Sequence, residues 1–290
     1  MRESLAHVAH RIGRWTDRLL PDRERAARLA EALDREFGGT AEQISAAGCR
    51  RIEEICHRVS RHLTLEFHAG GSLVPDGDQA MGWPPPDGAA IARAGGGVAA
   101  VERHADLAVL RVDSLESWEP AGPFVTSAFA RTAGCRGLVL DLRNNGGGDM
   151  ETLARIAGFV LGPRVVTLAT VTTVDGVDHV RTTAGHPGWG RRAVVLTSER
   201  TYSSGEALAY VLQNRGVTVI GQATAGASDH CTPVRISPHV VALIPYGVVR
   251  DPVTGGNWEG TGVVPDLEVP PGAELSAAMR ACADGARPAP

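Results

Sequence analysis

The sequence predicts an α/β domain with a largely parallel sheet, preceded by a small helical bundle. From about residue 98 onward, buried-strand patterns alternate with helical patterns, which is typical of parallel βαβ units. Before residue 69, apolar residues recur at helical spacing instead. The 290 residues, of which 43% are hydrophobic, suffice for one large domain or two smaller ones.

The region from 1 to 68 is predicted to form a three-helix bundle. One helix begins after Leu20-Pro21-Asp22, and Gly38-Gly39 ends it. Thr40-Ala41-Glu42-Gln43 has the spacing of a capping box, which predicts that the next helix begins there.

Glycine and proline dominate residues 69–97, which we expect to be a linker loop. The predicted α/β core spans 98–275, and residues 276–290 are expected to be a C-terminal tail. Strands are expected at 107–112, 137–142, 165–171, 193–196, 217–221, 240–245 and near Val263, and helices at 122–133, 152–161 and after Ser203.

Charge and composition argue against several classes of partner. The net charge of −4 and the aromatic content of 4% give no reason to expect nucleic-acid binding. Apolar runs are shorter than the roughly 18–20 residues that span a bilayer, and the N-terminus lacks the core of a signal peptide. We therefore expect a cytoplasmic protein with no membrane partner. The five cysteines are widely spaced, so neither a metal site nor a disulfide framework is expected, and no cofactor is implied.

The most informative stretch places a serine where a buried strand gives way to a helix. Val194-Val195-Leu196 is the expected strand, and Thr201-Tyr202-Ser203-Ser204-Gly205-Glu206 begins the helix. The Ser203 hydroxyl would lie beside free backbone N–H groups and the positive end of the helix dipole. A serine in this place is either a nucleophile or a simple N-cap.

A glycine-rich turn follows another expected strand at Asp141-Leu142-Arg143-Asn144-Asn145-Gly146-Gly147-Gly148-Asp149. Consecutive glycines leave backbone N–H groups bare and permit positive φ, so the turn could accept an anion. Its spacing matches neither a dinucleotide loop nor a Walker loop. An oxyanion hole for acyl chemistry and a plain strand-to-helix turn remain as the two interpretations.

Two further residues carry ionisable groups that suit acyl transfer. Glu259 follows Trp258 among small residues, and a carboxylate near an apolar ring can orient and charge-balance a histidine. His62 precedes an alternating segment after the bundle. The alternatives are a solvated loop glutamate and a structural histidine.

Together, four blocks resemble a known family. DLRNNGGG, T-x-S-x-x-E, GQATAG and NWEGTGVVPD occur in the order found in the tail-specific, or C-terminal processing, serine peptidases. The bundle with its Leu20-Pro21-Asp22 helix start, and His62 after it, are most similar to the branch of interphotoreceptor retinoid-binding protein and the tricorn core protease. The resemblance covers roughly 15–270 and implies a ClpP/crotonase-like core of repeated ββα units. The 69–97 segment is too short for a PDZ domain.

The resemblance also implies a role for each site residue. Ser203 corresponds to the nucleophile and His62 to the general base, which Glu259 would orient. Gly148, with Gly147 adjacent, and the backbone N–H of Ser204 would form the oxyanion hole. This division of labour is chemically sound, because a serine hydroxyl needs a base to remove its proton as it attacks.

One departure from the family is decisive for the expected mechanism. Processing peptidases pair their serine with a lysine after the GxxTxG segment, but here Gly226 is followed by Ala227. A Ser–Lys mechanism is therefore excluded, and a Ser–His–Glu arrangement is expected. His230, three residues beyond the position of the lysine, is an alternative base.

The sequence thus predicts a serine peptidase that cleaves peptides, or a related small-molecule acyl substrate, through an acyl-enzyme. Two alternatives stay open. One is a binding protein for an apolar ligand, as in the retinoid-binding relative. The other is lyase, cyclase or different acyl chemistry in a biosynthetic pathway, as in crotonase-like enzymes. Because this fold often assembles, a homo-oligomer is also among the expected states.

Overall fold

The computed structural model describes residues 3–71, 80–182 and 192–283. The chain forms two compact units whose segments interleave in sequence. Of the segment 69–97, expected as a linker, residues 72–79 lie outside the described residues, and the described part includes helix α4 (Gly88–Arg93) and a 3-10 turn at Gly95–Gly97. Unit 1 comprises Met1–Pro85, Val171–Asp178 and Ala227–Val249, and unit 2 comprises Pro86–Thr170, His179–Gly226 and Arg250–Pro290.

Unit 1 begins with the three expected helices, α1 (Leu5–Leu19), α2 (Arg23–Phe37) and α3 (Ala46–Cys56). The capping box expected at 40–43 is wrong, because α3 begins later, with Ser45 as its N-cap. The Ser45 hydroxyl accepts from the N–H of Gly48 at 3.1 Å. Residues 42–44 instead pair with the chain before α1, where Leu5 N donates to Glu42 O and Ile44 N to Glu3 O.

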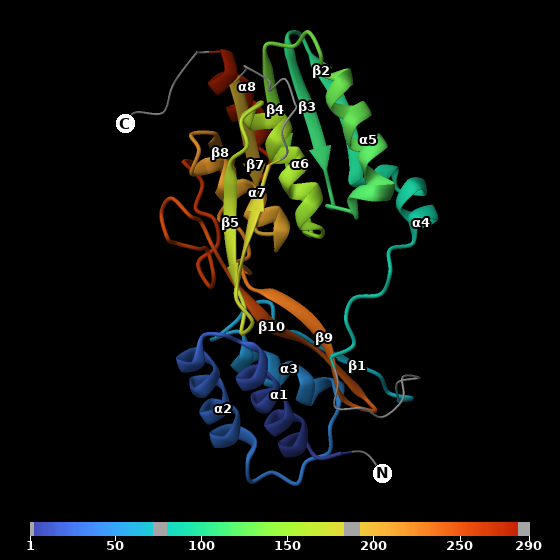
Figure 1. The fold of residues 1–290 in the computed structure, drawn as a ribbon, viewed down its shortest axis with the longest axis vertical. Coiled ribbons are helices and arrows are strands. Elements are labelled where there is room, and N and C mark those ends of the chain that lie inside the picture. Colours follow the sequence, from blue (N-terminus) through green and yellow to red (C-terminus); the bar gives the residue numbers. More distant parts are fainter. Residues whose placement is uncertain (1–2, 72–79, 183–191, 284–290) are drawn as a thin grey trace. The chain divides into compact units, whose positions relative to one another are not determined.

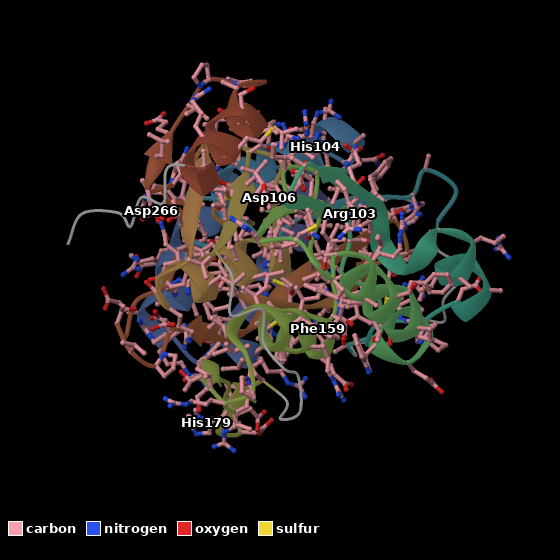
Figure 2. The ribbon with its side chains drawn as sticks, turned by 90° about the horizontal axis from the view of Figure 1, so that it is seen from above. Arg103, His104, Asp106, Phe159, His179 and Asp266 are labelled. Atoms are coloured by element: carbon pink, nitrogen blue, oxygen red, sulfur yellow. The ribbon has the colours of Figure 1, made fainter. Side chains whose placement is uncertain are left out.

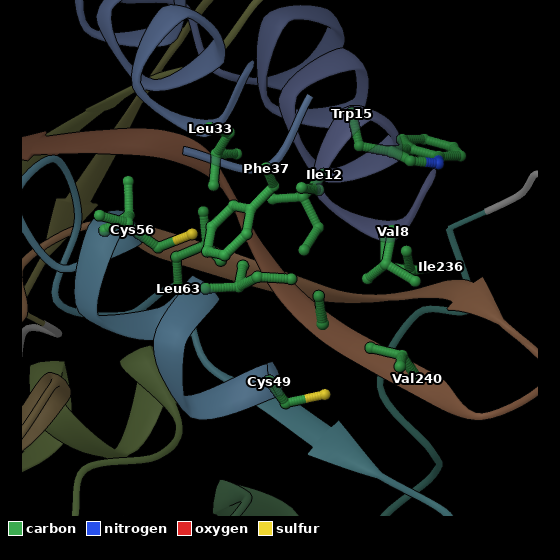
Figure 3. Packing of buried hydrophobic residues seen from close by; sticks show 14 of the residues in the cluster. Val8, Ile12, Trp15, Leu33, Phe37, Cys49, Cys56, Leu63, Ile236 and Val240 are labelled. Carbon is green, nitrogen blue, oxygen red and sulfur yellow. The ribbon is translucent and has the colours of Figure 1, made fainter. Parts of the chain in front are cut away.

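The helices of unit 1 share their core with a sheet. In this sheet, β10 (Val240–Arg250) pairs antiparallel with both β1 (Leu65–Phe67) and β9 (His230–Ser237). The end of β5 (Thr167–Thr172) and the start of β6 (Val177–Arg181) also belong to unit 1, which includes Val171–Asp178. Val8 of α1 lies beside Ile236 of β9 (Figure 3), and Ile12, Phe37 and Val240 belong to the same buried cluster. The strand at 240–245 is thus found, but in unit 1.

The described residues of unit 2 form a six-stranded sheet in the order β11-β8-β7-β4-β3-β2, of which Figure 1 labels β8 to β2. Among the described strands of this sheet, the pairs from β3 to β11 are parallel and β2 pairs antiparallel with β3, which confirms the predicted α/β class with a largely parallel sheet. The segment near Val263 is a loop, and the last strand follows it. The strands are β2 (Val98–His104), β3 (Leu107–Val112), β4 (Gly137–Asp141), β7 (Arg192–Thr197), β8 (Thr218–Gly221) and β11 (Leu267–Glu268).

Helices cover the sheet of unit 2 because its strands are apolar on both faces. Val109, Val139 and Val194 lie in register on one face and pack against Ala277 and Ala278 of α8 (Glu274–Ala283). The tail expected over 276–290 therefore begins inside a packed helix, and residues 284–290 lie outside the described residues. The remaining helices of the unit are α5 (Trp118–Arg131), α6 (Met150–Leu161) and α7 (Ser204–Gln213).

The antiparallel edge of this sheet is fixed by the tight β2–β3 hairpin. The hairpin turns at Ala105, which has a positive φ of 55°. Figure 2 labels Arg103 and Asp106 on either side of this residue. Arg103 donates from Nη2 to Ala133 O at 2.5 Å, and Asp106 O accepts from Arg136 N. These bonds tie the hairpin to the loop that leads into β4. Within the described part of the chain, no helix has the length and apolarity required to cross a membrane.

Candidate active site

Ser203 lies in a strained turn between β7 and α7, which we call the serine turn (201–206). Its backbone has φ 55° and ψ −127°, a conformation that residues other than glycine rarely adopt. Strain of this kind persists only where the surroundings enforce it, and it is concentrated at functional sites. Because β3, β4, β7 and β8 are parallel, the turns that follow them meet at one edge of the sheet, where α/β proteins place their sites.

A buried carboxylate enforces the serine turn. Glu206 is fully buried, and its Oε2 accepts from the backbone N–H of Ser203 at 2.8 Å. Its Oε1 accepts from Thr224 Oγ1 at 2.5 Å and from the N–H of Gly226 at 2.6 Å. Three donors on one carboxylate make strong, charge-assisted bonds. Glu206 therefore locks the serine turn to the GQATAG segment (221–226) that follows β8.

The glycine loop (142–149) approaches Ser203 so closely that no side chain fits between them. A Cβ added to Gly147 would lie 2.7 Å from Ser203 Cβ and 2.9 Å from Ser204 N, and Gly147 has φ 91°. Asn145, fully buried, holds the loop there. Its Oδ1 accepts from Gly147 N at 2.8 Å, its Nδ2 donates to Val112 O at 2.9 Å, and its carbonyl accepts from Tyr202 N.

Among the described residues, the backbone N–H groups of Gly148 and Ser204 in the glycine loop and the serine turn have no acceptor. The N–H of Gly147, in contrast, donates to Asn145 Oδ1. The Ser204 hydroxyl donates to Gly148 O at 2.8 Å, which joins the glycine loop to the first turn of α7. An N–H in the first helical turn has no intrahelical partner and favours a negative ligand. The arrangement suits stabilisation of a developing oxyanion.

The loop that carries Glu259 packs against the GQATAG segment. Gly260 N donates to Gly226 O at 2.8 Å, and Val263 N donates to Thr224 Oγ1 at 2.7 Å. Trp258 is buried with its ring 5.0 Å from that of Tyr210. Glu259 is half-buried, and its N–H donates to Asn257 Oδ1 at 3.2 Å.

His62 lies in unit 1, in the turn between α3 and β1. It is 8% exposed, and its Nδ1 is hydrogen-bonded to the backbone carbonyl of Asp229. A carbonyl only accepts, so Nδ1 must carry the proton and Nε2 the lone pair. Burial lowers the pKa of His62 below its ordinary 6.5, although the bond to Asp229 and the charge of that residue oppose this.

His230 also lies in unit 1, as the first residue of β9, with its ring 6.1 Å from that of Tyr246. Burial and, after it, repulsion from His62 lower the pKa of His230 to about 4. The negative charge of Asp229 acts on both histidines and opposes the lowering of their pKa values. The Asp229 carboxylate itself forms an ion pair with Arg25.

The predicted residues thus fall into two groups. Ser203, Ser204, Gly147 and Gly148 are brought together in unit 2, with the Glu259 loop packed on the neighbouring GQATAG segment, and His62 and His230 belong to unit 1. Sequence reasoning did not assign roles to Glu206, Asn145, Thr224, Asp229 and Arg25. The capping-box spacing of Ser203 and Glu206 was the available signal for the glutamate. In the described ranges, no group of three or more His, Cys, Asp or Glu residues is arranged to hold a metal ion.

Solved structures share this fold over nearly the whole chain. A candidate peptidase from Parabacteroides merdae ATCC 43184 has a TM-score of 0.68 at 18% identity, covering 98% of this chain and 99% of that one. A lipoprotein from Streptococcus agalactiae has a TM-score of 0.60 at 15% identity, covering 99% and 98%. The photosystem II D1 C-terminal processing protease has a TM-score of 0.57 at 16% identity, covering 99% of both chains.

The sequence itself identifies the family. Residues 106–269, more than half of the chain, match the model of peptidase family S41. The matched range contains the glycine loop, the serine turn, the GQATAG segment and Glu259. The chain belongs to peptidase family S41.

Proposed function

We propose that this protein is a serine peptidase with Ser203 as its nucleophile. One observation carries the proposal: Glu206 holds Ser203 at positive φ against the glycine loop, where the N–H groups of Gly148 and Ser204 have no acceptor among the described residues. A nucleophile next to two oriented donors is the arrangement that acyl transfer requires. The membership of the S41 family gives the reaction class.

The proposed reaction proceeds through an acyl-enzyme. Ser203 Oγ attacks the carbonyl carbon of a peptide as its proton passes to His62 Nε2, and the carbonyl oxygen becomes an oxyanion that accepts from Gly148 N–H and Ser204 N–H. The C–N bond then breaks as His62 returns the proton to the leaving amine, and water releases the acyl group by the reverse route. Each oxyanion donor contributes about 3–4 kcal/mol in comparable enzymes.

We assign the base to His62 and not to His230. The Nδ1–H bond of His62 to a carbonyl leaves Nε2 as the acceptor, as a general base requires. His230, whose pKa lies near 4, would take up a proton from serine less readily at neutral pH. Because Asp229 O already accepts from His62 Nδ1, we propose that Glu259 balances the charge of the histidinium.

The absence of lysine supports a histidine base. All 29 basic residues other than histidine are arginine, and Ala227 follows the GQATAG segment. Arginine keeps its proton at every accessible pH and cannot serve as a base. A Ser–Lys dyad from this chain is therefore ruled out in the proposed mechanism.

The proposal is tested with a broad peptide library and four purified proteins: wild type, Ser203→Ala, His62→Ala and His230→Ala. We expect wild type to cleave peptides, Ser203→Ala and His62→Ala to lose nearly all activity, and His230→Ala to retain most of it. Cleavage by Ser203→Ala at the wild-type rate would refute the nucleophile. An inactive wild type that retains a co-purified apolar ligand would favour a binding protein.

A further inference from the structure

Unit 1 contains a buried ion pair that the proposed reaction does not use directly. Arg25 lies in the first turn of α2, and its guanidinium donates to both carboxylate oxygens of Asp229, Nη1 to Oδ1 at 3.2 Å and Nη2 to Oδ2 at 2.5 Å. The side chain of Asp229 is fully buried and that of Arg25 is 13% exposed. Buried pairs of this kind add little net stability compared with apolar residues of equal volume, so their purpose is better sought in what they orient.

The same guanidinium also binds the chain that leads to His62. Its Nη2 donates to Val59 O at 2.6 Å, three residues before the histidine. On its other side, Asp229 uses its backbone carbonyl to accept from His62 Nδ1. Arg25 thus joins the two chain segments that supply the donor and the acceptor of this bond. A forked, planar guanidinium fixes such a geometry better than a single charge does.

We propose that the Arg25–Asp229 pair positions the general base, by holding His62 in the tautomer that carries its proton on Nδ1 and its lone pair on Nε2. Both residues act through His62, so they are positioning residues. The catalytic consequence rests on the proposed function, whereas the tautomer is a property of unit 1 itself.

The charges around His62 make the proposal testable by titration. Asp229 contributes a negative charge, Arg25 a positive one behind it, and His230 a ring that interacts electrostatically with His62. Loss of the Asp229 charge should make His62 harder to protonate, and loss of the Arg25 charge should make it easier. The two substitutions therefore shift the titration of His62 in opposite directions.

The experiment is nuclear magnetic resonance of the full chain labelled with ¹⁵N-histidine, which reports the tautomer and the pKa of each ring. We compare wild type with Asp229→Asn, Arg25→Gln and Arg25→Lys. The matched control is Arg28→Gln, which removes an exposed pair with Glu24 on the same helix. In wild type we expect His62 as the Nδ1–H tautomer, and in Arg28→Gln no change.

In Asp229→Asn the pKa of His62 should fall by about half a unit or more, and in Arg25→Gln it should rise by a similar amount while the Nδ1–H population decreases. In Arg25→Lys, which keeps the positive charge, the pKa of His62 should return to its wild-type value, but the Nδ1–H population should recover only in part. In an active enzyme, kcat should fall about 10-fold or more in Arg25→Gln with little change in KM.

The inference is overturned if His62 carries its proton on Nε2 in wild type, or if folded variants show no shift or shifts of the same sign. Should Arg25→Gln fail to fold, Asp229→Asn decides alone, because a loosened, more hydrated site would raise the pKa of His62 whereas loss of charge lowers it. If the tautomer and opposite shifts are found but no hydrolysis occurs, only the proposed function fails.

Discussion

The backbone N–H of Ser203 donates to the carboxylate of Glu206 at 2.8 Å, so a buried acid three residues along the chain holds the serine at its positive φ. The second oxygen of that carboxylate binds Thr224 and Gly226. One side chain therefore sets the turns after two parallel strands, β7 and β8. The chemistry proposed for Ser203 depends on this buried charge.

Substitution of Glu206 by glutamine should damage both stability and activity. The amide oxygen can replace only one carboxylate oxygen, so its NH2 group would face the N–H of Ser203 or the donors of Thr224 and Gly226. We expect a loss of about 1–3 kcal/mol in unfolding free energy, measured by urea titration, and loss of hydrolysis. The control is Glu199→Gln, an exposed acid just before the serine turn, which should leave both unchanged.

Alanine at Gly147 should impair catalysis more than alanine at Gly146. A Cβ at Gly147 meets Ser203 Cβ at 2.7 Å and also strains the backbone, whereas one at Gly146 meets nothing within 4 Å. We expect Gly147→Ala to lower kcat by about 100-fold or more, because the added methyl group displaces Ser203 and the backbone N–H of Ser204. Equal kcat values for the two variants would show that the glycine loop does not define the position of Ser203.

Much of the fold follows from local pattern. The strands of unit 2 are apolar on both faces, so they are buried only in a parallel sheet that helices cover. In unit 1, the two ends of α2 follow from its N-cap Asp22 and from Gly38 after its last residue. The start of α3 could not be predicted, because the capping spacing at Thr40 is overridden by pairing of residues 42–44 with the N-terminal segment. The assignment of residues 240–245 to the unit 1 sheet likewise depends on partners far away in sequence.

The site shows the same division. Ser203 and the glycines were identified because a strand followed by a helix start, or by consecutive glycines, is a local signal. Asp229 and Arg25, 204 residues apart, give no such signal, since their pairing depends on how α2 packs within unit 1. Asn145 is one residue of the glycine motif in the sequence. The structure shows that its side chain holds the glycine loop in place through hydrogen bonds to Val112 and Gly147.

Replacement of Glu259 tests whether a carboxylate supports the base electrostatically. We expect Glu259→Gln to lower kcat/KM by about 10–100-fold, because the histidinium that forms in the transition state loses a counter-charge while Asp229 O still orients the ring. The matched control is Glu268→Gln on the exposed strand β11, which should have no effect. A Glu259→Gln enzyme with wild-type kcat/KM would remove this residue from the mechanism.

His230 should make the protein less stable in acid. Its pKa is about 4 when folded and 6.5 when unfolded, so between these values the unfolded chain binds more protons and the unfolding free energy decreases as pH falls. The full difference corresponds to about 3 kcal/mol. Urea titrations at pH 7 and pH 4.5 should therefore show a smaller loss for His230→Gln than for wild type.

The control for this titration is His179→Gln, an exposed histidine on β6 that should leave the pH dependence unchanged (Figure 2). If His230→Gln lost as much stability as wild type over this interval, the ring would be titrating normally in the folded protein.

Labelling with a fluorophosphonate probe, with the adduct located by mass spectrometry, measures whether Ser203 is a nucleophile that His62 activates. We expect a single adduct on Ser203 in wild type, formed far more slowly in His62→Ala and at the wild-type rate in Glu199→Gln. An adduct on another residue would rule out Ser203 as the nucleophile, and labelling of Ser203 at an unchanged rate without His62 would rule out His62 as its base.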